Sequence, residues 1–136
     1  MALEIQGVAP LFQVFDMPTA IRFYRDKLGF EVVSASPQLS DQAEDVNWAM
    51  LQLNGTTVML NTAYEPEYRP QAPDPARIAV HTDVCLYFGC PDVDQAYREL
   101  RAQGLEIEEP KIAPYGMKQL YLTDPDGFQL CFQRPA

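Results

Sequence analysis

Two stretches of the chain share one pattern of apolar and polar positions. In residues 14–28 and 90–102, an apolar segment leads through an Asp into a helix whose apolar positions recur every three or four residues. Asp16 and Asp92 are the expected helix N-caps, and a glycine ends each helix before a new strand begins. A repeat of this length predicts that one supersecondary unit is used twice.

Apolar runs and turn sequences predict four strands in each half of the chain. Asn54-Gly55 and the Asp-Pro-Asp-Gly sequence at 124–127 are typical hairpin turns. The sequence therefore predicts two βαβββ modules in a single domain over residues 1–136, at about 5–64 and 81–134, joined by a Pro-rich linker at about 65–80. The expected strands are residues 8–14, 30–34, 47–53 and 57–61, and then 84–89, 105–109, 117–123 and 128–133.

Strand alternation assigns the side chains to two faces, because successive residues point in opposite directions. One face collects aliphatic residues such as Leu51 and Leu60 and is expected to pack under the helices. The other, inner face collects aromatic, sulfur-containing and neutral amide side chains. The candidate ligand-binding residues lie on it, with Tyr115 in a loop over the site: Leu11, Gln13, Trp48, Met50, Met59, Asn61, Cys85, Tyr87, Tyr115, Met117, Gln119, Tyr121 and Cys131; Gln52 and Gln133 share the inner face.

Composition and charge narrow the choice of partners. The net charge of −9 argues against nucleic acid and anionic membranes, which attract basic surfaces. No apolar run approaches the ~20 residues that span a bilayer, and the N-terminus lacks a signal-peptide pattern. Three cysteines without CxxC spacing do not form a disulfide framework. We therefore expect a cytoplasmic protein whose partner is a small molecule.

Three segments resemble the vicinal-oxygen-chelate superfamily, which contains glyoxalase I, bleomycin-resistance proteins and extradiol dioxygenases. They are IRFYRDKLGFEV at 21–32, DVDQAYRELRAQGLEI at 92–107 and LTDPDGFQLCF at 122–132. The resemblance implies an α+β fold in which two βαβββ modules form a curved eight-stranded mixed sheet. Helices would cover the convex face, the concave face would enclose a ligand cavity, and two copies would form a homodimer.

The resemblance also implies four metal-ligand positions, which this sequence fills differently. Metal-using members take His or Gln from the first strand and Glu from the last strand of each half. The matching positions here are Ala9, Cys85, Cys131 and, within one residue, Met59. Alanine has no donor atom, and a thioether is a poor ligand for hard divalent ions. Two thiolates could hold Zn or Cu(I), but structural zinc prefers four ligands. We expect no metal and no other cofactor.

The inner face also lacks the groups on which general acid–base catalysis usually relies, since its strands supply no Asp, Glu, His, Lys or Arg. The leading hypothesis is a metal-independent, bleomycin-resistance-like protein that binds a small hydrophobic or aromatic molecule and is not an enzyme. No catalytic residue is assigned. Two alternatives stay open: a metal-dependent lyase, isomerase or dioxygenase of the same superfamily, and a dimerisation or regulatory module.

Several side chains have two interpretations. Trp48 and Met50 either form a stacking platform for a ligand or fill the cavity or a dimer interface. Cys85 and Cys131 are either a reactive pair or small packing groups, and the lack of a nearby cation favours packing. His81, the only histidine, is expected ~13 Å from Cys85 along an extended chain, which favours a role in the linker.

Overall fold

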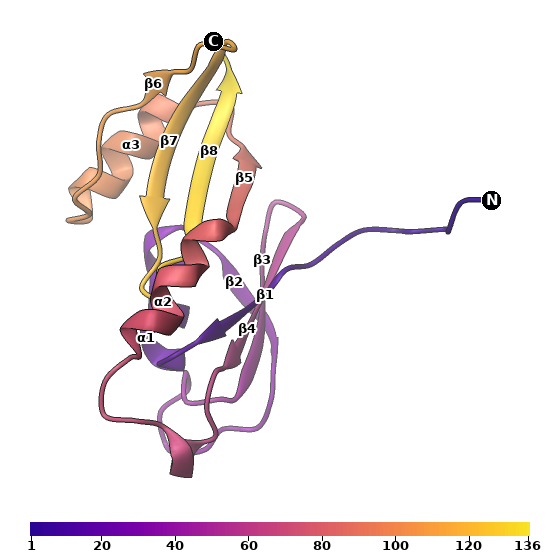
Figure 1. The fold of residues 1–136 in the computed structure, drawn as a ribbon, viewed down its shortest axis with the longest axis vertical. Coiled ribbons are helices and arrows are strands. Elements are labelled where there is room, and N and C mark those ends of the chain that lie inside the picture. Colours follow the sequence, from indigo (N-terminus) through magenta and orange to yellow (C-terminus); the bar gives the residue numbers. More distant parts are fainter. The chain divides into compact units, whose positions relative to one another are not determined.

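Each half of the chain folds as the βαβββ unit that the repeat predicts (Figure 1). The computed structural model describes residues 1–136 and comprises two compact units, residues 1–70 and 71–136. The first unit contains β1 (Leu11–Val14), α1 (Met17–Arg22), the π-helical turn η1 (Phe23–Lys27), β2 (Glu31–Ala35), β3 (Trp48–Leu53), β4 (Thr56–Thr62) and the 3₁₀ turn η2 (Pro66–Tyr68). The second contains α2 (Pro75–Val80), the 3₁₀ turn η3 (His81–Asp83), β5 (Cys85–Gly89), α3 (Val93–Ala102), β6 (Lys111–Ile112), β7 (Met117–Thr123) and β8 (Gln129–Pro135).

The eight strands form two four-stranded mixed sheets with the same topology. The strand orders are β1-β4-β3-β2 and β5-β8-β7-β6. In each sheet the first strand of the unit pairs in parallel with the last, and the other pairs are antiparallel. The α+β class and the two modules are therefore confirmed, with one sheet in each module.

The helix starts follow from the two aspartates that the repeat singles out. The Asp16 carboxylate accepts from the backbone N–H of Thr19 at 3.0 Å, and Asp92 accepts from that of Gln95 at 2.9 Å. Each carboxylate thereby satisfies an N–H that the first helical turn leaves unpaired. Both predicted N-caps are confirmed.

The two-face prediction is also confirmed within each module. In β3 and β4, Ala49, Leu51, Val58 and Leu60 are fully buried, while the side chains between them keep some exposure. In the second module, Leu120, Leu122 and Leu130 are buried in the same way. Helix α1 packs against β4, and α3 packs against β7 and β8. Burying each of these leucines stabilises its module by about 2 kcal/mol.

Prolines explain where two strands depart from prediction. The first strand starts at Leu11 instead of residue 8, because Pro10 has no N–H to donate to a ladder. The strand expected at 105–109 is wrong, and β6 instead forms at Lys111–Ile112 after Pro110. The N–H of Ala113 donates to the carbonyl of Met117 at 2.8 Å, which fixes the pairing of β6 with β7.

Helix α2 forms inside the segment expected to be a proline-rich linker. The Asp74 carboxylate caps it by accepting from the N–H of Ala76 at 3.0 Å, and Pro75 occupies the first turn, where a missing N–H costs nothing. No helix of the chain combines the length and apolar character that a membrane crossing requires.

The α2–η3 segment packs against the turn between β7 and β8. Gly127 has φ +88°, and a Cβ there would lie 2.8 Å from Ile78 Cγ2 and 3.2 Å from the Ile78 carbonyl oxygen. His81 Nδ1 lies 2.5 Å from the Asp126 carbonyl oxygen, and its ring stacks on Phe128 at 4.0 Å. These contacts give His81 a structural role.

Candidate functional site

In the first module, the sheet face opposite the buried leucines carries the predicted ligand-binding residues. The pairing of β1 with β4 sets Leu11 beside Met59, and the pairing of β3 with β4 sets Met50 on the other side of Met59. Two residues further along the strands, Asn61 lies between Gln13 and Trp48 in the same way. We call this set the first open face: Leu11, Gln13, Trp48, Met50, Met59 and Asn61.

The first open face is mainly apolar and carries no charged side chain. Leu11 is 43% exposed, and Trp48, Met50 and Met59 are half-buried. Asn61 Nδ2 donates to Gln13 Oε1 at 3.2 Å and to the Thr62 carbonyl oxygen at 3.3 Å. An indole and two thioethers form an adaptable apolar surface, which suits contact with a flat organic molecule.

The second module presents an equivalent face with different chemistry. Here Tyr87 of β5 and Tyr121 of β7 flank Cys131 of β8, and Gln119 pairs with Gln133. Tyr115 joins them from the loop before β7. We call this set the second open face: Cys85, Tyr87, Tyr115, Met117, Gln119, Tyr121, Cys131 and Gln133.

A chain of hydrogen bonds links the polar side chains of the second open face. The hydroxyl groups of Tyr87 and Tyr121 lie 3.2 Å apart, and Tyr121 donates to Gln119 Oε1 at 3.2 Å. Gln119 Nε2 donates to the Tyr115 hydroxyl at 2.8 Å and to Gln133 Oε1 at 2.9 Å. Five neutral side chains therefore hold each other in place.

The tyrosine pair covers Cys131. Tyr87 and Tyr121 lie on the strands at either side of it, so their hydroxyls can meet only above β8. Cys131 has no exposed surface, whereas Tyr87 and Tyr121 are 53% and 45% exposed. A ligand that approaches this face therefore meets the tyrosines before it meets the thiol.

The two thiols of the second open face, Cys85 and Cys131, are uncharged near neutral pH. Burial raises the pKa of the Cys85 and Cys131 thiols. A thiol needs a lowered pKa to be a strong nucleophile at neutral pH, so neither cysteine is activated.

The residues at the expected metal-ligand positions do not fit a divalent ion. The pairings Leu11–Met59 and Tyr87–Cys131 occupy equivalent places, so Met59 is the counterpart of Cys131. Ala9 precedes β1 and has no donor atom. Nowhere do three His, Cys, Asp or Glu side chains come together in an arrangement that could hold a metal ion. Hard divalent ions require oxygen or imidazole ligands that these positions lack.

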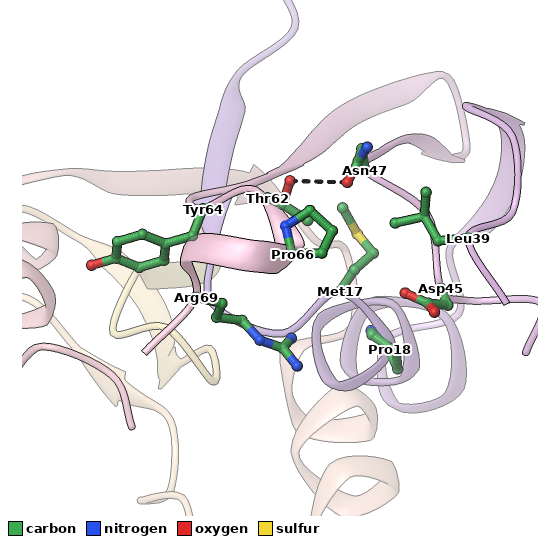
Figure 2. A pocket seen from close by; sticks show the side chains of 9 residues that line it. All are labelled: Met17, Pro18, Leu39, Asp45, Asn47, Thr62, Tyr64, Pro66 and Arg69. Atoms are coloured by element: carbon green, nitrogen blue, oxygen red, sulfur yellow. Dashed lines mark hydrogen bonds between the residues drawn. The ribbon is translucent and has the colours of Figure 1, made fainter. Parts of the chain in front are cut away.

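A separate pocket of about 240 Å³ lies at the end of the first module's sheet (Figure 2). Its polar wall includes Thr62 and Asn47, whose side chains are hydrogen-bonded at 3.5 Å. Arg69 lines it too, but its guanidinium already pairs with Asp16 at 3.0 Å and lies over the Phe15 ring. The remaining lining residues are Met17, Pro18, Leu39, Asp45, Tyr64 and Pro66.

The structure thus brings the predicted site residues together as two sets, one on each sheet. The hydrogen-bonding role of Gln133 was missed, although its alternation with Cys131 places it on the same face. The pocket in Figure 2 was missed entirely, because eight of its nine residues lie outside the strands and follow no strand alternation.

Comparison with known proteins gives a consistent family. A sequence model of the Glyoxalase/Bleomycin resistance protein/Dioxygenase superfamily matches residues 7–132. A search of curated proteins found no match.

Solved structures share the fold at low sequence identity. TnmS3, an antibiotic-binding protein from Streptomyces sp. CB03234, has a TM-score of 0.71 and 22% identity, and the match covers 99% of this chain and 100% of that one. A bleomycin-binding protein complexed with bleomycin has a TM-score of 0.69 and 19% identity, covering 97% and 100%. TioX from Micromonospora sp. ML1 has a TM-score of 0.68 and 22% identity, covering 95% and 96%.

Proposed function

Because this chain belongs to the Glyoxalase/Bleomycin resistance protein/Dioxygenase superfamily, we propose that it binds a small hydrophobic or aromatic organic molecule without a metal ion. The ligand lies against the open faces of the sheets. Two of the similar folds belong to proteins described as binding an antibiotic or bleomycin, which supports a role in small-molecule binding.

The chemistry of the two open faces carries this proposal. Both combine partly exposed aromatic or thioether groups with neutral amide groups, the second adds tyrosine hydroxyls, and neither set includes a charged side chain. Such surfaces bind apolar molecules by contact and orient them with a few hydrogen bonds. They lack both an acid–base group and an activated nucleophile, the usual means of metal-free catalysis.

The absence of suitable ligands supports metal independence. Catalysis of the glyoxalase or dioxygenase type would need a metal at positions occupied here by Ala9, Met59, Cys85 and Cys131. We therefore propose binding and release of an unaltered ligand. Elemental analysis of protein purified without chelator tests this point, because a stoichiometric divalent ion would contradict it.

Ligand screening tests binding itself. Trp48 is the only tryptophan, so quenching of its fluorescence by a library of aromatic antibiotics and metabolites reports contact near the first open face. Met50→Ala and Met59→Ala should each weaken an observed ligand about tenfold, since each removes a thioether contact. Tyr68→Ala changes an exposed residue outside both faces and serves as the control. Failure of every aromatic compound to bind would overturn the proposal.

Two further proposals concern the setting of this activity. We propose a cytoplasmic homodimer, because three cysteines without partners suit a reducing compartment and many superfamily members pair. Sedimentation equilibrium at micromolar concentration tests the dimer, and a monomer mass at all concentrations would contradict it.

A further inference from the structure

The direction of the hydrogen bonds on the second open face can be worked out from the number of hydrogens available. Gln119 Nε2 has two hydrogens, and both are used, on the Tyr115 hydroxyl and on Gln133 Oε1. The single hydroxyl hydrogen of Tyr121 is used on Gln119 Oε1. In the contact between Tyr87 and Tyr121, Tyr121 must therefore accept and Tyr87 must donate.

This assignment leaves different groups free at the two ends of the network. At one end, the Tyr115 oxygen accepts from Gln119, so its own hydrogen is free to donate to a ligand. Gln133 Nε2 at the same end also has no acceptor in the protein. At the other end, the Tyr87 hydrogen is engaged and only its oxygen lone pairs remain. Along the strand direction the two ends are about 7 Å apart, because Tyr87 pairs with Cys131, two residues from Gln133.

Exposure places the free donor where a ligand can reach it. Tyr115 is 68% exposed, whereas Gln119, which holds it, is only 6% exposed. The buried amide thus orients an accessible hydroxyl. A ligand group that meets this end must accept a hydrogen bond.

We infer that the second open face selects aromatic carbonyl compounds, whose carbonyl oxygen accepts from the Tyr115 hydroxyl while the ring system lies on Tyr87 and Tyr121. This inference rests on the proposed binding function and adds the chemical class of the ligand. A hydroxyl group on the far side of the same ligand would donate to Tyr87.

A pair of probes with the same skeleton tests the inference. 9-Fluorenone and fluorene are planar tricyclic compounds that differ in a carbonyl against a methylene group. We expect the protein to bind fluorenone about fivefold more tightly, the gain typical of one neutral hydrogen bond. Titration calorimetry, or NMR where solubility limits it, measures both affinities.

Two variants on opposite sides of Gln119 make the test specific. Tyr115→Phe should bring the fluorenone-to-fluorene ratio close to one and leave the affinity for fluorene unchanged. Tyr121→Phe should keep the ratio at or above its original value, because Tyr87 then loses its acceptor and becomes a second free donor. Tyr68→Phe is the matched control, since Tyr68 is exposed and lies outside both faces.

The outcomes separate this inference from the proposed function. Equal affinity for the two probes, or a preference that survives Tyr115→Phe, overturns the selectivity for carbonyl compounds while aromatic binding stands. If neither fluorenone nor fluorene binds, the inference is overturned. The proposed function is overturned only if every compound of the aromatic library fails to bind. Hydrogen exchange of the Gln119 side-chain amide, followed by NMR, tests the network without a ligand. Both amide protons should exchange slowly in the unaltered protein, and one of them should exchange faster in Tyr115→Phe.

Discussion

Met59 and Cys131 occupy the same place in the two modules, yet their surroundings differ. Each lies on the last strand of its sheet, beside the first strand's Leu11 or Tyr87. Met59 is half-buried among apolar neighbours, whereas Cys131 is fully buried between two hydrogen-bonded tyrosines. The same strand pairing therefore supports an adaptable apolar surface in one module and a fixed polar network in the other.

The difference shows which face of each sheet specifies the fold. The faces under α1 and α3 are alike, with buried aliphatic side chains in both modules. The open faces can change because their side chains contribute less to the core, so substitutions there alter recognition at little cost in stability. The following predictions test this separation, from the largest expected effect to the smallest.

Truncation of a helix-facing leucine should destabilise either module by a similar amount. Leu60 and Leu130 are both fully buried, so Leu60→Ala and Leu130→Ala should each lower the free energy of unfolding by about 3 kcal/mol. Met59→Ala, one residue from Leu60 on the open face, should cost about 1 kcal/mol. Urea unfolding followed by circular dichroism measures all three. Equal costs for Leu60→Ala and Met59→Ala would show that the two faces are not separate.

Thiol labelling should distinguish the two equivalent positions. Cys131 has no exposed surface, so its reaction requires local opening of the tyrosine pair and should be about 100-fold slower than that of a partly exposed thiol. In a background without other cysteines, Met59→Cys supplies that matched thiol. Reaction with Ellman's reagent gives both rates. Similar rates would mean that Tyr87 and Tyr121 do not shield Cys131.

The hairpin turns should also respond differently to an added methyl group. Gly55 and Gly127 both have positive φ, +80° and +88°, but only Gly127 has neighbours within 4 Å of an added Cβ. Gly55→Ala should cost about 1 kcal/mol for its backbone conformation, and Gly127→Ala about 2 kcal/mol because Ile78 must also move. Thermal unfolding compares them. An equal loss of stability in the two variants would show that α2 moves aside without cost to make room for the added methyl group.

Substitutions at the two helix N-caps should show the smallest difference in stability, and this difference should depend on pH. Burial of Asp16 tends to raise the pKa of its carboxyl group. Hydrogen bonds from Thr19 and the charge of Arg69 outweigh burial and lower this pKa below its ordinary value of 3.8. Its ionised form therefore stabilises the fold above pH 3.8, and this contribution is lost as pH falls below that value. Asp16→Asn should cost about 0.5 kcal/mol at pH 7, after allowance for solvent screening, and progressively less as the pH falls below 3.8.

Asp92→Asn is the control for that experiment, since Asp92 caps α3 without an ion pair. Asparagine is an equally good N-cap, so Asp92→Asn should leave stability nearly unchanged at neutral and at acidic pH. A pH-dependent loss at Asp92 as large as that at Asp16 would show that Arg69 contributes nothing.

The parts of the fold that the sequence predicts are those with a local physical signal. Asn54-Gly55 and the 124–127 turn fix the hairpin registers, and alternation along β3, β4, β7 and β8 then assigns both faces. The counterpart of Cys131 was predicted as Met59 within one residue, and the strand pairing places it there.

The parts that were not predicted depend on single prolines and on tertiary contacts. Pro110 moves β6 from residues 105–109 to Lys111–Ile112, and Asp74-Pro75 starts a helix where several prolines suggested an irregular linker. The burial of Cys131 and Gln119 also exceeds what alternation predicts, because it depends on where tyrosine side chains meet.

Each sheet closes entirely with strands of its own module, and this has a consequence for how the chain folds during synthesis. The parallel pair that completes the first sheet joins Leu11 to Met59, and no strand after β4 is needed for it. A ribosome adds about 5–20 residues each second, so the first sheet has several seconds to form while the second half is being made. The sequential appearance of the two units avoids the competition between equivalent strands of the two modules that refolding of the whole chain from denaturant would allow.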